Sequence, residues 1–387
     1  MVKKYIFQLC ACSNDPAIPC EQLVSINNRL HNELTLQKNN ITSYHRKRKW
    51  EKYKKLSNDY ELIYSTNTHF PSISSYHPLS RSYFKLWEIL TDMPDAIKCA
   101  VDPTKPMQVA FLADAPGGFV QAFSDYRRRV AKCPTGQKDR CYAISLRPRD
   151  SYTPQWKLTP EFCKENNIEL VYGSDESGDL CKPSVVDSFV QHVGDASCDL
   201  VTADGGFDFS SDFNGQEELS THLITAEVNA AMRLQKRGGA FVLKIYDMRT
   251  VQTMHILHTL VQSYDKVFVF KPLSSRPANS EKYIIASGFN GARWGGKCLK
   301  NIPHRLLHDV VEYNAFYISC QIACICKTIK YIHAEKTQKD VCKTQLYKAV
   351  KWCHKYAIPI NIQALHTYKH IMDNIKRRCS LQTKPCC

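Results

Sequence analysis

The feature that most restricts the fold is a series of short apolar segments that alternate with helical segments. Because strands that alternate with helices form parallel sheets, this order predicts an open, mainly parallel α/β sheet. Ligands of such sheets bind at the carboxyl ends of the strands, and the Gly-rich and Asp-rich turns of this chain fall at such ends. The predicted strands are 109–112, 141–146, 168–172, 198–203, 240–246, 266–270 and 281–286.

The segments between these strands have helical periodicity. The clearest helix has an apolar stripe at Leu219, Leu223, Ala226, Ala230 and Leu234, and we expect the glycines at 238–239 to end it. Further helices are predicted over 81–90, from the turn at 113–119 to the arginines at 127–129, and over 253–264. Arginines suit the carboxyl end of a helix because of its dipole.

The charge of the 387-residue chain, formally +15, is unevenly distributed. Residues 1–80 hold 11 basic and 6 acidic side chains, residues 301–387 hold 14 and 5, and residues 81–300 hold 27 and 26. We therefore divide the chain into a basic N-terminal extension (1–75), a central domain (76–300) and a basic, Cys-containing helical extension (301–387). Basic flanks are suited to binding a polyanion such as nucleic acid, or to binding a partner protein. The alternative is that they form a solvated helical surface.

The densest basic run covers residues 45–55 and contains two aromatic residues, Trp50 and Tyr53. Aromatic rings within a basic run can stack on bases while the cations hold phosphates. Equally, the run can form an exposed basic helix with both rings on its buried side. Such a run also fits a nuclear-localisation signal.

Neither a metal centre nor a membrane segment is predicted. The 18 cysteines are too dilute for a disulfide scaffold, and Cys320, Cys324 and Cys326 lack the spacing of a structural zinc site. Reduced thiols in a cytoplasmic protein are the better interpretation, with a nuclear location left open. No apolar run has the ~18–20 residues that span a bilayer. Gln8 interrupts the short apolar stretch near the N-terminus, so we expect no signal peptide.

Four polar residues lie at suggestive places around the strand ends. Lys85 precedes the first strand, Asp204 ends the fourth, Lys244 interrupts the apolar strand 240–246, and Glu281 begins the last strand. A lysine in an apolar strand is costly unless it is paired or serves chemistry. The turn 113–119, with the sequence ADAPGGF, follows the first strand, and its glycines let a ligand approach the backbone closely.

With these motifs, residues 81–289 resemble the FtsJ/RrmJ-type 2′-O-ribose methyltransferases, most closely the cap-specific mRNA enzymes of eukaryotes and large DNA viruses. The matching strings are RSYFKLWEI at 81–89, ADAPGGF at 113–119, TADGGF at 202–207 with QEEL at 216–219, LK at 243–244, and KPLSSRPANSEKY at 271–283. The last string is long and unusual, and it is the most specific of the set.

The resemblance implies a Rossmann-like fold that binds S-adenosylmethionine (SAM), with a mainly parallel seven-stranded sheet whose last strand is antiparallel. It implies a catalytic set of Lys85, Asp204, Lys244 and Glu281. Substrate-binding positions are Glu218, Arg276, Asn279 and Ser280. Cofactor-binding positions are Ala113, Asp114, Ala115, Pro116, Gly117, Gly118, Phe119 and Asp179.

One position departs from the family pattern. Relatives often have an acidic residue five positions before the loop proline, where this chain has Phe111; its acid is Asp114, two positions before Pro116. The departure concerns the contacts to the methionine part of SAM, and some viral members of the family look similar.

The resemblance also implies a chemistry, in which a ribose 2′-OH loses its proton as it attacks the methyl group of SAM. We expect Lys244 to be the base, its pKa lowered by burial beside the cation of Lys85, with Asp204 and Glu281 orienting both lysines. The implied substrate is the first transcribed nucleotide of capped mRNA. The alternatives are the same chemistry on rRNA or an internal RNA site, and an inactive RNA-binding subunit that retains the fold.

Overall fold

The computed structural model describes residues 6–10, 16–19, 21–46, 48–65, 67, 69–97, 105–130, 138–148, 153–207, 209, 212–295 and 301–369. The end of the predicted C-terminal extension, from 370, therefore lies outside the described residues. The chain divides into two compact units. The first comprises residues 1–35, 78–272 and 280–318, and the second comprises 36–77, 273–279 and 319–387.

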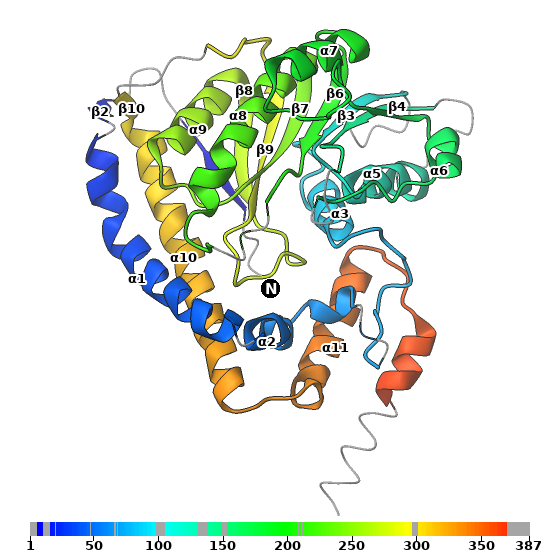
Figure 1. Ribbon diagram of the computed structural model, residues 1–387, viewed down its shortest axis with the longest axis vertical. Coiled ribbons are helices and arrows are strands. Elements are labelled where there is room, and N and C mark those ends of the chain that lie inside the picture. Colours follow the sequence, from blue (N-terminus) through cyan, green and yellow to red (C-terminus); the bar gives the residue numbers. More distant parts are fainter. Residues whose placement is uncertain are drawn as a thin grey trace, which may run out of the picture. The chain divides into compact units, whose positions relative to one another are not determined.

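An eight-stranded sheet forms the centre of the first unit (Figure 1). Its strand order is β1-β8-β9-β7-β6-β3-β4-β5. The strands are β1 (Ile6–Leu9), β3 (Gln108–Leu112), β4 (Arg140–Ile144), β5 (Ile168–Val171), β6 (Cys198–Ala203), β7 (Gln235–Ile245), β8 (Tyr264–Phe270) and β9 (Lys282–Phe289). Strands β3 to β7 pair in parallel, whereas β9 runs antiparallel to both β7 and β8. The predicted mainly parallel sheet with an antiparallel last strand is confirmed.

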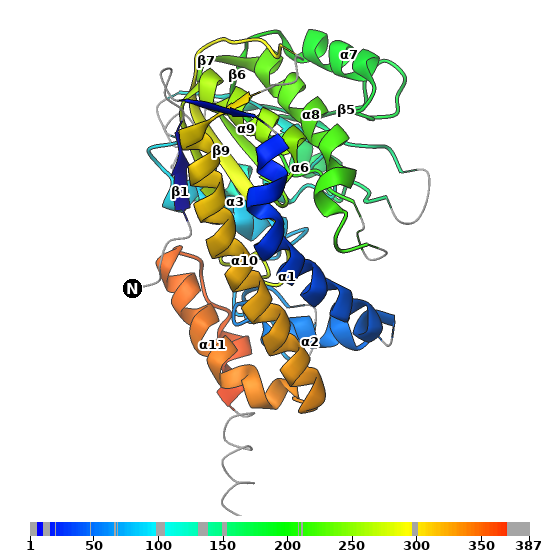
Figure 2. The same ribbon diagram turned by 90° about the vertical axis from the view of Figure 1, so that its left-hand side faces the viewer.

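Strand β1 is an eighth strand that the sequence analysis did not predict. It pairs antiparallel with β8 at the edge of the sheet. The ring of Phe7 stacks at 4.4 Å on that of Tyr313, which lies on helix α10 (His304–His333), and the Tyr313 hydroxyl donates to the carbonyl of Gln8. Figure 2 shows α10 beside β1. The N-terminal segment is thus an edge strand held by aromatic residues some 300 positions later.

Helices cover both faces of the sheet (Figure 1). Helices α3 (Ser82–Asp92) and α5 (Gly118–Arg129) pack side by side, and α8 (Gln216–Leu234) packs between α7 (Pro183–Val193) and α9 (Val251–Ser263). Because parallel crossovers are right-handed, α5 and α8 lie on opposite faces. The short helix α6 (Pro160–Glu165) precedes β5. One continuous apolar core joins the sheet to α7, α8, α9 and the start of α10.

The glycines at 238–239 do not end helix α8, contrary to the prediction. The helix ends at Leu234 and β7 begins at the next residue, so both glycines lie within the strand. The pairing of β7 with β6 shifts register between Cys198 and Leu200, beside these glycines. An added Cβ at Gly239 would stand 2.9 Å from the Lys236 carbonyl oxygen, which explains the small residue there.

The second unit contains helix α2 (Lys49–Ser57), the short helix η1 (Glu61–Ile63) and helix α11 (Gln338–Lys355). The Gln345 amide of α11 donates to the carbonyls of Lys55, Leu56 and Asn58, which fixes α11 against the end of α2. Trp50 and Tyr53 are buried. Of the two interpretations of the basic run, the structure therefore supports the exposed helix with buried rings.

Two remaining helices and a small sheet complete the described structure. The boundaries of the units fall within α1 (Glu21–Arg46) and α10. A second sheet pairs β2 (Ala17–Pro19) with β10 (Asn301–Pro303), although no strand was predicted after residue 300. Among the described residues, no helix has both the length and the apolar character needed to span a bilayer.

Candidate active site

The predicted catalytic residues converge because of the strand directions. Asp204 follows β6, and Lys244 lies near the carboxyl end of the neighbouring β7. Since β9 runs antiparallel to β7, its amino end, which begins just after Glu281, reaches the same edge of the sheet. Lys85 comes from the buried helix α3.

These four side chains form one ion-pair cluster. The Lys85 ammonium donates to Oε2 of Glu281 at 2.8 Å. Lys244 Nζ lies 3.7 Å from the same oxygen and 3.6 Å from Oδ1 of Asp204. All four side chains are nearly buried, with exposures between 8% and 12%. The cluster thus holds two positive and two negative charges in a largely dry site.

The electrostatics of Lys244 differ from the prediction. Burial alone would lower the pKa of Lys244, but its electrostatic interactions with Asp204, Tyr246, Glu281 and Glu227 outweigh burial and raise that pKa above its usual range. Lys85 therefore does not bring Lys244 toward neutrality. The reason is geometric, because the carboxylate of Glu281 lies against both ammonium groups and stabilises their charges.

Glu281 is the common partner within the cluster. Burial alone would raise its pKa, but Lys85, Lys244 and Lys271 together hold the pKa of this carboxyl well below its usual range. Lys271 also donates from Nζ to the backbone carbonyl of Glu281 at 2.7 Å. Burial, Lys282 and Lys85 lower the pKa of Lys271 to about 7, so it is Lys271 that titrates near neutrality.

Sequence reasoning missed two further residues of this cluster. The buried Tyr283 hydroxyl donates to Oδ1 of Asp204 at 2.7 Å, and Tyr283 lies opposite Lys244 in the sheet. Lys282 donates from Nζ to the carbonyls of Tyr246 and Ser280, which ties the ends of β7 and β9 together. Both residues lie in the KPLSSRPANSEKY string. Because residues two apart in a strand share a face, the position of Tyr283 two residues after Glu281 was the available signal for Tyr283.

The Gly-rich loop follows β3 at this edge, and Asp114 organises it from within. The two carboxylate oxygens of Asp114 accept the N–H groups of Phe119 and Val120 at 3.1 and 2.9 Å, in the first turn of α5. Burial and Asp204 raise the pKa of Asp114 well above its ordinary value. Asp114 thus links the loop to the first turn of α5 through hydrogen bonds. The ring of Phe119 is fully buried and belongs to the core.

The two glycines of the loop are required by their backbone conformation and by close packing against neighbouring side chains. Gly117 has a φ of 106°, and an added Cβ at Gly118 would meet the hydroxyl oxygens of Ser80 and Ser82 at 2.2 and 2.0 Å. Ala113, Ala115 and Pro116 complete the loop, with the Ala115 N–H donating to the Ser145 hydroxyl at the end of β4. Larger side chains at either glycine would therefore disrupt the loop.

Asp179 lies in the loop after β5. Its Oδ1 accepts the N–H of Cys181 at 3.0 Å, and the residue is half-buried. An added Cβ at Gly178 would stand 1.9 Å from the Ser145 carbonyl oxygen, so this loop presses against the end of β4. The structure therefore brings Asp179 to the same edge of the sheet as the Gly-rich loop.

Glu227 is a buried carboxyl behind the strand end. It is fully buried on α8, and neither of its oxygens has a hydrogen-bond partner within the described residues. An added Cβ at Gly205 would stand 2.3 Å from its Oε1 and 3.2 Å from the Cβ of Ala113, so Gly205 admits this contact. Burial raises the pKa of Glu227 to about 8, although Lys244 opposes the shift.

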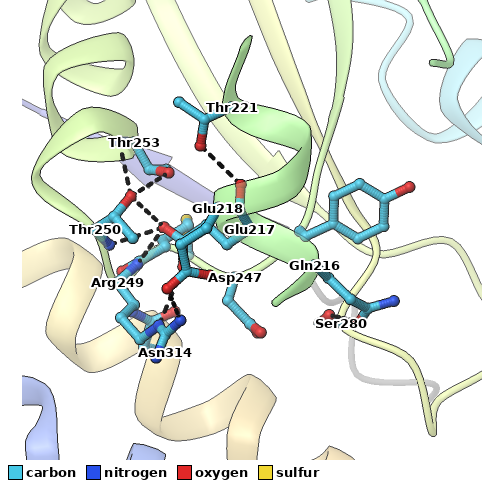
Figure 3. A network of polar contacts seen from close by, with 12 residues as sticks. Gln216, Glu217, Glu218, Thr221, Asp247, Arg249, Thr250, Thr253, Ser280 and Asn314 are labelled. Carbon is cyan, nitrogen blue, oxygen red and sulfur yellow. Dashed lines mark hydrogen bonds and ion pairs between the residues drawn. The ribbon is translucent and has the colours of Figure 1, made fainter. Parts of the chain in front are cut away.

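The start of α8 fastens the loop that follows β7 and the residue that precedes Glu281 (Figure 3). Oε1 of the buried Glu217 accepts the backbone N–H groups of Arg249 and Thr250 and the Thr250 hydroxyl, at 2.8 to 2.9 Å. The Ser280 hydroxyl donates to Oε1 of Gln216 at 2.6 Å. Ser280, which was predicted to bind substrate, is buried, and this hydrogen bond holds it in place directly before Glu281.

The other predicted substrate residues have different surroundings. Glu218 is half-exposed and forms an ion pair with Arg249. Arg276 and Asn279 belong to the second unit. There the Arg276 guanidinium donates to both carboxylate oxygens of Glu61, and the Asn279 N–H donates to the Arg276 carbonyl. Within the described part of the chain, no group of three or more His, Cys, Asp or Glu residues could hold a metal ion.

The fold and this edge define a class of protein. A Rossmann-like sheet with one inserted antiparallel strand, and with a Gly-rich loop after its central strand β3, is the framework of methyltransferases. Residues 78–289 match the FtsJ-like methyltransferase family. The matched segment covers more than half of the chain, and the protein belongs to this family.

Curated relatives match a shorter stretch. The chain is 39% identical over 126 residues to the cap-specific mRNA (nucleoside-2′-O-)-methyltransferase of Autographa californica nuclear polyhedrosis virus, a match covering 33% of this chain and 48% of that protein. It is 38% identical over 122 residues to cap-specific mRNA (nucleoside-2′-O-)-methyltransferase 1 of Trypanosoma brucei brucei, covering 31% of this chain and 33% of that protein. The chain thus spans less than half the length of these relatives.

The bonds of Glu217 predict a sharp difference between two adjacent residues. Glu217→Ala leaves three partly buried donors without this acceptor, and we expect it to lower the free energy of unfolding by about 2–3 kcal/mol. Glu218→Ala removes only a half-exposed ion pair and should cost less than about 1 kcal/mol. Urea denaturation of both variants measures the difference. Equal losses would contradict the role of Glu217 in holding the loop.

The raised pKa of Glu227 predicts a pH-dependent stability. Between its unfolded value of 4.5 and its folded value of about 8, the folded protein keeps a proton that the unfolded chain releases, so this contribution to stability falls as pH rises. Glu227→Gln removes the dependence. We expect its stability relative to wild type to increase between pH 5 and 8, by at most about 1.4 kcal/mol per unit.

Thermal unfolding across this pH range provides the measurement, and Glu218→Gln, at a half-exposed position, is the control that should show no trend. A constant difference between Glu227→Gln and wild type would show that Glu227 is ionised in the folded protein.

Proposed function

We propose that this protein is a SAM-dependent methyltransferase that methylates the ribose 2′-OH of the first transcribed nucleotide of capped mRNA. The observation that carries the proposal is the cluster of Lys85, Glu281, Lys244 and Asp204 at the edge of the sheet that also holds the Gly-rich loop. The names of the relatives from a baculovirus and a trypanosome support the choice of capped mRNA.

The loops at this edge fit SAM. Gly117 and Gly118 let the Gly-rich loop turn tightly at this edge, and Asp179 approaches from the loop after β5. When bound, SAM would supply an electrophilic methyl group on a positively charged sulfur. The carboxylate of Asp114 is already engaged by two N–H groups, so we assign it to shaping the loop rather than to contacting the cofactor.

Lys244 has the central role in the proposed chemistry. Its ammonium would bind the ribose 2′ oxygen. Its neutral form would accept the hydroxyl proton as the new C–O bond forms and the methyl–sulfur bond breaks, with the sulfur leaving as a neutral thioether. Because its pKa is raised in the cluster, the neutral form requires an additional positive charge nearby. A positive charge beside Lys244 would lower its pKa, because it disfavours the ammonium form. A bound sulfonium has that charge.

The other members of the cluster would position Lys244. Glu281 joins Lys85 to Lys244, and Tyr283 fixes the Asp204 carboxylate on the opposite side. The four charges balance, so the reacting groups enter a site without a large net field. Holding the hydroxyl in line with the methyl group would provide much of the rate enhancement.

The proposal is tested with labelled SAM and three RNAs of one sequence, which carry a 7-methylguanosine cap, an unmethylated cap or a 5′-triphosphate. We expect label on the 2′ oxygen of the first nucleotide of the 7-methylguanosine-capped RNA only. Lys244→Met should lower the single-turnover rate at least 100-fold, whereas Lys266→Met, at an exposed position on β8, should leave it unchanged.

Two outcomes would contradict the proposal in different ways. Label at internal riboses irrespective of the 5′ end would indicate a methyltransferase of rRNA or internal RNA sites. Full activity of Lys244→Met would exclude Lys244 from the chemistry.

A further inference from the structure

The two compact units differ sharply in charge. The residues of the second unit include 22 basic and 6 acidic side chains, whereas those of the first include 30 and 31. The entire positive surplus of the chain therefore belongs to the unit that contains α2 and α11. A compact body with so large a surplus attracts polyanions and repels other cations.

Helix α11 concentrates this charge on one face. Lys339, Lys343, Tyr347 and Lys351 follow one another at intervals of four and are exposed. At 1.5 Å per residue, successive members lie about 6 Å apart along the helix axis. The helix contains five lysines but one acidic residue, Asp340. The Asp340 carboxylate accepts the N–H and hydroxyl of Thr337 at the helix N-terminus, so it is engaged in capping.

The opposite face of α11 is packed, which fixes the charged face in place. Val341, Cys342, Gln345, Ala349 and Trp352 are buried, and Gln345 bonds to the end of α2. Like charges at a spacing of four destabilise a helix by roughly 0.2–0.5 kcal/mol for each pair, as for Lys339 and Lys343. A row of lysines that destabilises the helix when no ligand is bound, and that packing of the opposite face holds in place, is suited to binding an anion.

An aromatic ring within the lysines identifies the kind of anion. The Tyr347 side chain is 62% exposed, with lysines one turn before and one turn after it. The Lys351 ammonium lies 6.0 Å from the centre of this ring. Cations that hold the backbone, combined with an exposed ring on which a base can stack, are characteristic of single-stranded nucleic-acid sites.

We propose that the face of α11 formed by Lys339, Lys343, Tyr347 and Lys351 binds single-stranded RNA. The lysines contact successive phosphates and Tyr347 stacks on a base, without regard to the 5′ end. This inference rests on the proposed function for the identity of the polyanion as RNA, but not on methyl transfer. This binding differs from cap recognition, because the face of α11 would contact the RNA chain rather than its 5′ cap.

The test is the salt dependence of binding to a fluorescent single-stranded RNA, with and without a cap, in the absence of SAM. The combined variant Lys339→Gln, Lys343→Gln and Lys351→Gln should reduce the slope of log K against log salt by about 2, since each lost phosphate contact on a single strand contributes about 0.7. Both RNAs should lose affinity equally. The matched control replaces Lys138, Lys164 and Lys266, exposed lysines of the first unit, and should leave the slope unchanged.

Tyr347 separates stacking from charge. Tyr347→Ala should weaken binding about tenfold without changing the salt slope, and Tyr347→Phe should retain the affinity. Melting temperatures verify folding, and the lysine variant should melt no lower than wild type because it removes repulsion. An unchanged slope and affinity in a folded lysine variant would overturn the proposal, whether the face is then merely solvated or contacts a protein.

The two proposals can fail separately. If wild type methylates capped RNA but the α11 variants bind RNA like the control, only the inference about α11 fails. If the α11 variants lose RNA affinity while wild type methylates no RNA, the proposed function fails and the RNA-binding face stands.

Discussion

The buried carboxylate of Glu281 is the interaction on which the rest of the site depends. The carboxylate accepts a hydrogen bond from the Lys85 ammonium and lies beside the ammonium of Lys244. The backbone carbonyl of Glu281 accepts a hydrogen bond from Lys271. Without the negative charge of Glu281, the Lys85 and Lys244 ammonium groups would lose a carboxylate partner in a nearly dry site, at a cost of several kcal/mol. The antiparallel course of β9 delivers Glu281 to the edge where β6 and β7 deliver Asp204 and Lys244. The chemistry of the site thus follows from the topology of the sheet.

The supports of this cluster come from α8. Glu217 holds the loop after β7, Gln216 holds the residue before Glu281, and Glu227 fills the space beside Gly205. One helix therefore touches each strand end that carries a predicted catalytic residue. The first unit achieves this with almost no net charge, while the second carries the whole surplus. The proposed methyl transfer and the proposed binding of RNA thus belong to different units.

Periodicity and strand order were sufficient to predict most of the fold. The central strands follow from apolar runs, and the rule that parallel strands end at one edge brings Asp204 and Lys244 together. The inclusion of Lys85, on helix α3, and of Glu281, before the antiparallel strand β9, rested on the family resemblance. Strand β1 could not be predicted, because a four-residue edge strand with Gln8 in it depends on α10, far along the chain. Nor could the sequence separate buried Glu217 from exposed Glu218, or predict the pKa of Lys244, which depends on distances of a few ångströms to several charges.

We propose that Lys244 and Glu281 act as one charge-balanced pair. A double-mutant cycle on the single-turnover rate of methyl transfer, with saturating SAM and capped RNA, tests this coupling. We expect Lys244→Met combined with Glu281→Gln to be about as slow as the slower single variant, because either change alone already breaks the pair. Losses that multiply, as for independent residues, would contradict it.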